Sequence, residues 1–166
     1  MFANRPHIKV ESTTADHVME LIAIVGVLAG LAVVLAAWPS LPQQVPVRVN
    51  LAGQPVAWGD RNTLFLLPAI GALVYGLLTL GGMLPPWLYN YPWKITEENA
   101  PRQYQLARRL MRSVKLICAW LFTFITLDMV RLAQGHTGFT MLATPALLAA
   151  VFVVIVVYFV LSYRAR

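Results

Sequence analysis

The chain has 166 residues, of which 58% are hydrophobic and 12% are charged, and its formal net charge is +6. A soluble domain is usually about a quarter charged and slightly under half apolar, so this composition indicates an integral membrane protein. A membrane span takes about 20 apolar residues, so the length allows four spans and no separate soluble catalytic domain. Because cytoplasmic loops of membrane proteins collect Lys and Arg, the positive charge does not lead us to expect nucleic acid as a partner.

The chain begins with a polar tail over residues 1–17, and the first span is expected over residues 18–37. Thr13 and Asp16 are three residues apart just before the apolar run, which predicts an N-terminal helix cap. The long polar lead and the full span length favour a retained membrane anchor over a cleaved signal peptide.

Gly26 and Gly30 are four residues apart within the first span. Small residues at this spacing let two helix backbones approach closely in lipid. The pair therefore predicts a packing surface, either for a second protein or for another span of the same chain.

A long polar loop over residues 38–62 separates the first two spans. The valines at 45, 47 and 49 alternate with other residues, which is typical of a strand, and Gly53 lies in a turn sequence before a second short apolar stretch. We expect an extended or hairpin-like loop that either docks a partner or packs as a lid over the helix ends. The candidate partner-binding residues are Trp38, Pro46, Arg48, Asn50 and Trp58, together with Gly26 and Gly30.

The second span is expected over residues 64–84, with Asn62 or Thr63 as its cap. A connector over residues 85–113 follows. It opens with clustered aromatic residues and continues as a basic amphipathic helix that lies on the membrane or rises from it. Its cations are candidates for binding anionic lipid or a cytoplasmic partner, and they are Arg102, Arg108, Arg109, Arg112 and Lys115.

The third span is expected over residues 114–132 and the fourth over 145–163, followed by a short end at 164–166. Thr144 with Pro145 resembles a helix start. Asp128 and Arg131 are three residues apart near the end of the third span. An ionisable residue inside a span is a functional candidate by default, but this spacing also predicts a self-sufficient intramembrane ion pair.

The distribution of cations predicts the orientation, because cytoplasmic loops carry an excess of Lys and Arg. Four spans place both termini and the connector on one side of the membrane and the 38–62 loop on the other. The first side carries ten of the 13 cations, and Arg48, Arg61 and Arg131 are on the second. We therefore expect cytoplasmic termini and an outer loop.

The sequence does not predict a catalytic or cofactor site. The three histidines do not place two imidazoles opposite each other within the bilayer, which argues against a haem, and Cys118 is the only cysteine. Familiar hydrolase, metalloprotease and phosphate-loop motifs are missing. We expect no catalytic residue, no cofactor and no metal ligand, and therefore no enzyme.

Two segments together resemble a known family. The loop segment LPQQVPVRVNLAGQPVAWG and the connector segment YNYPWKITEENAPRQYQLARRL resemble a bacterial membrane family with a domain of unknown function, over about residues 20–135. A related domain forms the N-terminal part of SdpI-type toxin-immunity proteins. The resemblance implies a bacterial inner-membrane protein with no known enzyme activity. SdpI-type proteins carry additional spans in a second domain, and this sequence contains only four expected spans.

These observations predict an all-α integral membrane protein with four transmembrane helices in a single domain over residues 18–163. The expected function is non-enzymatic interaction, as an accessory or stabilising subunit of a larger membrane assembly. Its partners are then membrane lipids and other membrane-protein subunits. The alternative is an SdpI-like immunity or sensor protein whose outer loop binds a secreted peptide toxin. A small transporter or membrane enzyme is the weaker alternative and depends on Asp128.

Overall fold

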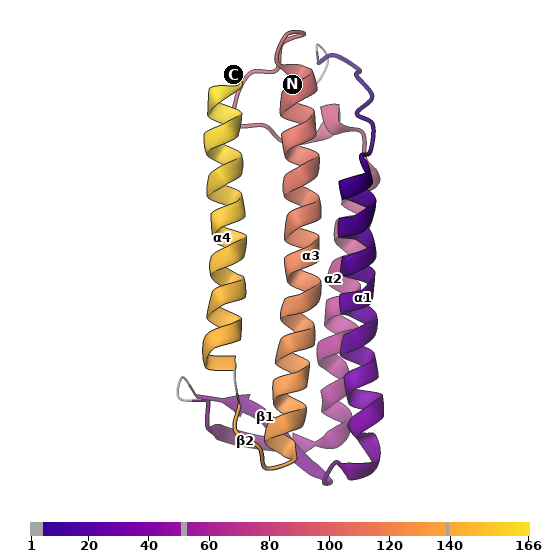
Figure 1. The fold of residues 1–166 in the computed structure, drawn as a ribbon, viewed down its shortest axis with the longest axis vertical. Helices are drawn as coiled ribbons and strands as arrows, with labels where there is room; N and C mark the ends of the chain where they lie inside the picture. The colour runs from indigo at the N-terminus through magenta and orange to yellow at the C-terminus, as the bar shows by residue number, and fades with distance from the viewer. Residues whose placement is uncertain (1–4, 51–52, 139) are drawn as a thin grey trace.

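The computed structural model describes residues 5–50, 53–138 and 140–166. In that part of the chain, four helices are long and apolar enough to cross a membrane, which makes the protein a multi-pass membrane protein. Figure 1 shows α3 in the middle, with α4 on one side and α1 and α2 on the other. A two-stranded hairpin closes one end of the bundle, here called the hairpin end. The tail that leads into α1 from residue 5, the C-terminus and the α2–α3 connector lie at the other end, the connector end.

Helix α1 (Thr14–Ala37) begins with the expected cap. The Thr13 side chain accepts a hydrogen bond from the Asp16 backbone N–H, and the Asp16 carboxylate accepts one from the Thr13 backbone N–H. This reciprocal capping box satisfies two N–H groups that a helix start otherwise leaves without acceptors. The predicted N-terminal cap is confirmed.

Strands β1 (Gln44–Val49) and β2 (Pro55–Asp60) form an antiparallel hairpin, as the alternating valines predicted. Pro46 pairs with Trp58 and Arg48 with Ala57, so Val47 has no direct partner and forms an irregularity in the ladder. The hairpin turn is held by Asn50, whose side-chain oxygen accepts from the Gln54 backbone N–H at 2.9 Å.

Helix α2 (Leu66–Met83) follows a short 3₁₀ turn over Arg61–Phe65. The predicted cap at Asn62 or Thr63 is wrong. Asp60 caps the preceding 3₁₀ turn, because its carboxylate accepts the Asn62 N–H at 2.8 Å, and α2 itself begins after Phe65 without a side-chain cap. The strand therefore runs directly into the turn that starts the second span.

Helix α3 (Ala100–Ala133) is continuous over 34 residues. At about 1.5 Å per residue it is roughly 50 Å long, which exceeds the hydrocarbon core of a bilayer. The connector helix and the third span are thus one element, so the amphipathic connector helix rises from the membrane and does not lie flat. No proline or glycine interrupts this stretch beyond Pro101 in the first turn.

Helix α4 (Thr140–Arg164) starts before the predicted Thr144–Pro145 cap, so these two residues lie inside the helix. The prediction failed because Pro145, lacking an N–H, leaves only one helical hydrogen bond unmade and is tolerated near a helix start. At the connector end α4 is fastened to α3 by a buried pair. Gln103 Nε2 donates to the Ser162 carbonyl at 2.8 Å, and Ser162 Oγ donates to Gln103 Oε1 at 2.6 Å.

Two buried clusters hold the ends of the molecule together. At the hairpin end the cluster joins α1, the hairpin, the 3₁₀ turn and α3, and its buried members are Val34, Leu41, Val45, Leu64, Met129 and Val130. At the connector end the cluster joins the connector to α3 and α4, and its buried members are Tyr91, Ile95, Ala100, Tyr104, Ala107 and Tyr158. Between them, many large apolar side chains of α1, α2 and α4 are exposed, as expected for helix faces in contact with lipid.

Candidate functional site

The hairpin is anchored to the helices through one part of its surface. Val45 is fully buried against Val34 of α1 and Met129 of α3, and Pro46 is also buried. Burying a valine side chain contributes about 1.5–3 kcal/mol, so this contact holds the hairpin firmly over the helix ends. The loop is therefore a packed lid, which was one of its two predicted roles.

The same hairpin also exposes large apolar side chains. Val47, Val56 and Trp58 are 45%, 55% and 56% exposed, and Arg48 between them is exposed as well. Trp and Arg are the residues most enriched in the energetically important centres of protein interfaces. The hairpin therefore presents an exposed Trp, two Val and an Arg on a scaffold that is already ordered, which lowers the entropy cost of any contact made there.

Not every residue predicted to bind a partner lies on this exposed surface. Arg48, Asn50 and Trp58 are exposed, whereas Pro46 is buried. Trp38 is half-buried, and the Arg61 guanidinium lies 4.5 Å from its ring centroid, so Trp38 is engaged within the chain. Asn50 stabilises the hairpin turn.

Gly26 and Gly30 pack against another span of the same chain, which is one of the two roles that their spacing predicted. Both are buried against α3. A Cβ added at Gly26 would lie 3.1 Å from Trp120, and one at Gly30 would lie 3.1 Å from Thr123 Oγ1. Thr123 Oγ1 donates to the Gly26 carbonyl at 2.6 Å, so the small residues bring two helices of the same chain together.

At the connector end, two ion pairs join α1 to α3. Arg112 Nη1 lies 2.6 Å from Asp16 Oδ1, and Lys115 Nζ lies 2.5 Å from Glu20 Oε2. Asp16 and Glu20 are four residues apart on α1, and their partners are three apart on α3, so both pairs form along one line of contact. Asp16 therefore caps its own helix and binds α3 at the same time.

The Lys115–Glu20 pair is also tied to α2. The Tyr75 hydroxyl donates to Glu20 Oε1, and Lys115 Nζ donates to Thr79 Oγ1 at 3.1 Å. Lys115 is only 6% exposed, and its ammonium lies 5.0 Å from the Tyr75 ring centroid. One lysine thus connects three helices. Buried lysines are rare unless paired, and here the pair is complete.

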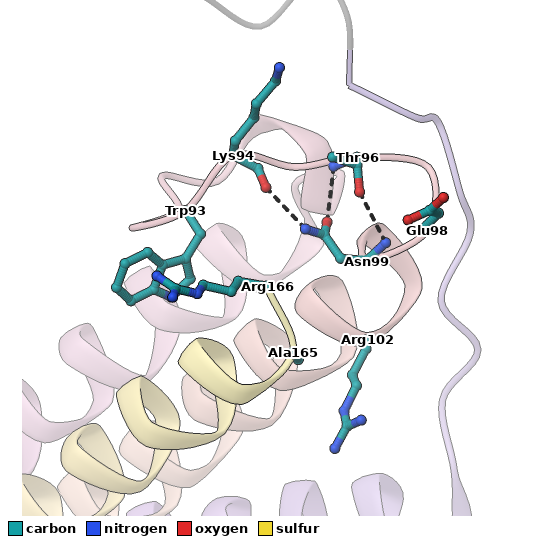
Figure 2. A pocket seen from close by; sticks show the side chains of 8 residues that line it. All are labelled: Trp93, Lys94, Thr96, Glu98, Asn99, Arg102, Ala165 and Arg166. Atoms are coloured by element: carbon teal, nitrogen blue, oxygen red, sulfur yellow. Dashed lines mark hydrogen bonds between the residues drawn. The ribbon is translucent and has the colours of Figure 1, made fainter.

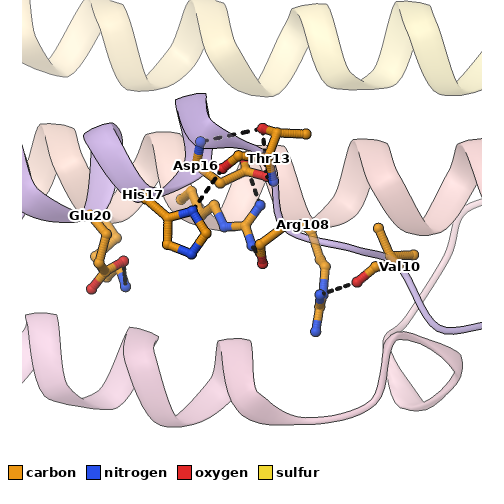
Figure 3. Close-up of polar contacts among 9 residues, drawn as sticks. Val10, Thr13, Asp16, His17, Glu20 and Arg108 are labelled. Atoms are coloured by element: carbon orange, nitrogen blue, oxygen red, sulfur yellow. Dashed lines mark hydrogen bonds and ion pairs between the residues drawn. The ribbon is translucent and has the colours of Figure 1, made fainter.

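The N-terminal tail is held along the same end by backbone carbonyls. Arg108 Nη1 donates to the Val10 carbonyl at 2.8 Å, as Figure 3 shows beside the Thr13–Asp16 cap. The Tyr104 hydroxyl donates to the Pro6 carbonyl at 3.0 Å. Arg5 Nη1 donates to the carbonyl of Tyr89 at 2.6 Å, so the tail also contacts the connector.

These contacts show that the five cations predicted to bind lipid or a cytoplasmic partner have different structural roles. Arg112 and Lys115 are paired with α1, and Arg108 holds the tail. Arg109 is exposed and lines a groove between α3 and α4, and Arg102 is exposed beside the C-terminus. Arg102 and Arg109 therefore lie apart from the other three cations, and the five do not form one continuous basic patch.

A larger hollow of about 570 Å³ lies on the connector-end surface, between the connector, the start of α3 and the C-terminus. Figure 2 shows Arg166 beside the Trp93 ring, while the Lys94 and Arg102 side chains extend in different directions. The Arg166 guanidinium lies 5.7 Å from the Trp93 ring centroid. Because its cations do not converge, this hollow shows no arrangement that recognises a particular anion.

The connector beside this hollow is rigidly packed. The Tyr91 hydroxyl donates to the Pro86 carbonyl at 3.0 Å, and the ring packs against Tyr104 with centroids 5.5 Å apart. Burial raises the pKa of the Tyr91 phenol far above its ordinary value, so the phenol stays neutral. Tyr91 is structural in these surroundings.

Asp128 is fully buried near the hairpin end of α3, whereas Arg131 is exposed. Gly138, in the link to α4, packs closely against the Asp128 carboxylate. A Cβ added to Gly138 would lie 3.0 Å from Asp128 Oδ2. The Asp128–Arg131 ion pair stays a prediction.

Sequence reasoning missed the acidic half of the connector-end cluster. Asp16 was recognised only as a cap, and Glu20 was assigned no role, although a Glu within an apolar span is itself a signal of a buried partner. Among the described residues, no three His, Cys, Asp or Glu side chains are grouped so that they could hold a metal ion.

Residues 25–72 match a family described as a domain of unknown function (DUF1648). The matched region runs from within α1 through the whole hairpin into α2. The comparisons with curated proteins and with solved structures found no match. The match supports a domain-of-unknown-function family for the segment that carries the hairpin.

Proposed function

We propose that this protein is a non-enzymatic interaction protein of the bacterial cytoplasmic membrane, acting as an accessory or stabilising subunit of a larger membrane assembly. The observation that carries the proposal is the hairpin, which is anchored by Val45 and leaves Val56 and Trp58 more than half exposed. Anchored apolar side chains at the water-facing end of a bundle are a suitable contact surface for another membrane protein.

The proposal places the hairpin outside the cell and the termini and connector in the cytoplasm. The support is the charge distribution, because most cations lie at the connector end and cytoplasmic segments collect Lys and Arg. The docking surface would then contact the outer domain of a companion subunit.

The test compares purification of three forms of the full chain from their native membrane in mild detergent. Trp58→Ala combined with Val56→Ala removes the exposed apolar surface without adding charge. Leu88→Ala is the control, because Leu88 is similarly exposed but belongs to the α2–α3 connector. We expect a companion in fixed proportion with the wild type and the control, and its loss from the double variant.

A solitary wild-type protein would contradict the accessory-subunit proposal. The hairpin would then remain as a receptor for a secreted peptide, as in the SdpI-like alternative. That alternative predicts that cells lacking the protein become more sensitive to peptide toxins of neighbouring cells, and that the Val56 and Trp58 double variant does not restore resistance.

A further inference from the structure

A cleft of about 170 Å³ opens at the connector end between α1, α2, α3 and the connector. Its charged lining consists of one carboxylate, Glu20, and three cations, Arg108, Arg112 and Lys115. Ligand pockets for drug-sized molecules are about 300–1,000 Å³, so this cleft suits a small polar group and not a whole lipid or peptide. Its charge predicts that the group is an anion.

Of the three cations that line the cleft, Arg108 is the one that forms no ion pair with a carboxylate of the described residues. Arg112 pairs with Asp16 and Lys115 pairs with Glu20, but among the described residues no carboxylate lies within ion-pair distance of Arg108. One of its five N–H donors reaches the Val10 carbonyl, and its Nε is buried without an acceptor. An arginine with an unsatisfied donor beside a cleft is suited to phosphate, because its planar fork matches phosphate oxygens.

The depth of the cleft matches the level of lipid headgroups. Eighteen residues separate Lys115 from the hairpin-end terminus of α3 at Ala133, which is about 27 Å of helix. Arg108 lies about 10 Å farther out. The hydrocarbon core is about 30 Å thick and the bilayer with headgroups about 40–45 Å, so the cleft spans the boundary where lipid phosphates lie.

The mouth of the cleft is apolar on the side of α2. Met83 lines the cleft and is 73% exposed, and the nearby Leu80 and Leu84 are exposed too. These side chains offer a surface for acyl chains next to a polar interior. A free phosphate ion gains nothing from this surface, whereas a phospholipid uses both parts.

We propose that this cleft binds the phosphate-bearing headgroup of an anionic phospholipid, with Arg108 as the residue that donates to the phosphate. The ion pairs Lys115–Glu20 and Arg112–Asp16 shape the cleft and leave its lining with an excess positive charge. A phosphatidylcholine headgroup is disfavoured, because its ammonium would lie beside the same cations.

The test measures binding of phosphatidylglycerol to the delipidated full chain in detergent by native mass spectrometry, with phosphatidylcholine and inorganic phosphate as parallel probes. Arg108→Gln should weaken phosphatidylglycerol binding at least about tenfold. Arg109→Gln is the matched control, because it removes the same charge from the next residue, which lies outside the cleft. It should leave the affinity unchanged.

A second variant keeps every charged contact. A Cβ at Gly82 meets nothing within 4 Å, and Gly82 lines the cleft, so Gly82→Leu should fill the cleft without disturbing the fold. Gly76→Leu adds the same side chain to the same helix outside the cleft and serves as its control. We expect Gly82→Leu to weaken phosphatidylglycerol binding about tenfold and Gly76→Leu to leave it unchanged.

Equal loss with Arg108→Gln and Arg109→Gln would show diffuse electrostatic attraction and overturn the proposal. Unchanged binding in Gly82→Leu would overturn it as well. Tight binding of inorganic phosphate that depends on Arg108 and displaces the lipid would overturn the assignment to a lipid. Weak phosphatidylcholine binding beside strong phosphatidylglycerol binding would support it.

Discussion

At the scale of single residues, Lys115 has the most demanding environment in the molecule. Its side chain is almost fully buried, and its ammonium contacts Glu20 of α1 and Thr79 and Tyr75 of α2. A buried charge is stable only while its partners remain, because desolvation of an unpaired ion costs several kcal/mol. Lys115 therefore makes the packing of three helices depend on one ion pair.

Lys115→Met should lower the free energy of unfolding in detergent by up to about 3 kcal/mol, because Glu20 would lose its counter-charge. The double variant with Glu20→Leu should be less destabilised than the sum of the two single variants. Arg109→Met is the control, since Arg109 is exposed and its loss should be nearly neutral. Denaturant unfolding of the wild type, the two single variants and the double variant measures the coupling, and strictly additive costs would contradict the pairing.

At the scale of secondary-structure elements, α3 organises the bundle because every other long helix packs against it. Small residues make the close contacts. Gly26 and Gly30 admit Trp120 and Thr123, and Gly71 of α2 admits Phe122, where an added Cβ would lie 2.9 Å from the Phe122 Cβ. The packing of these α3 side chains against glycines sets how closely α1 and α2 approach α3.

Gly71→Ala should therefore destabilise the protein by about 1–3 kcal/mol, since the added methyl group forces α2 away from α3. Gly76→Ala in the same helix meets nothing within 4 Å and should be neutral or slightly stabilising, because alanine favours helix. Thermal unfolding of both variants in the same detergent provides the comparison. A Gly71→Ala protein as stable as Gly76→Ala would show that this contact is looser than the structure indicates.

At the scale of the whole molecule, the two ends of the bundle differ in the polarity of their contacts. The hairpin end has a small apolar core and an exposed apolar hairpin, whereas the connector end has ion pairs, a polar cleft and a tail tied down by arginines. Most cations are at the connector end, which predicts that it lies in the cytoplasm.

A labelling experiment tests this orientation. In a Cys118→Ala background, Gln43→Cys places one thiol at the hairpin end and Glu97→Cys places one at the connector end, both at exposed positions. An impermeant thiol reagent added to intact cells should label the first and not the second, and lysis should expose the second. Labelling of the thiol at 97 in intact cells would reverse the proposed orientation.

The sequence alone was sufficient to predict the four spans, the α1 cap and the hairpin, because these depend on local properties. Apolar length, a Thr and Asp at capping spacing, and alternating valines around a turn act within a few residues of one another. Only the tertiary structure could decide that Gly26 and Gly30 pack within the chain and that Glu20 pairs with Lys115. It also decided that Arg102 and Arg109 lie apart from the other three basic residues of α3. Each of these outcomes involves contacts between residues that are far apart in the chain. Such contacts depend on which helix faces meet, and the local sequence pattern of a single span does not determine that.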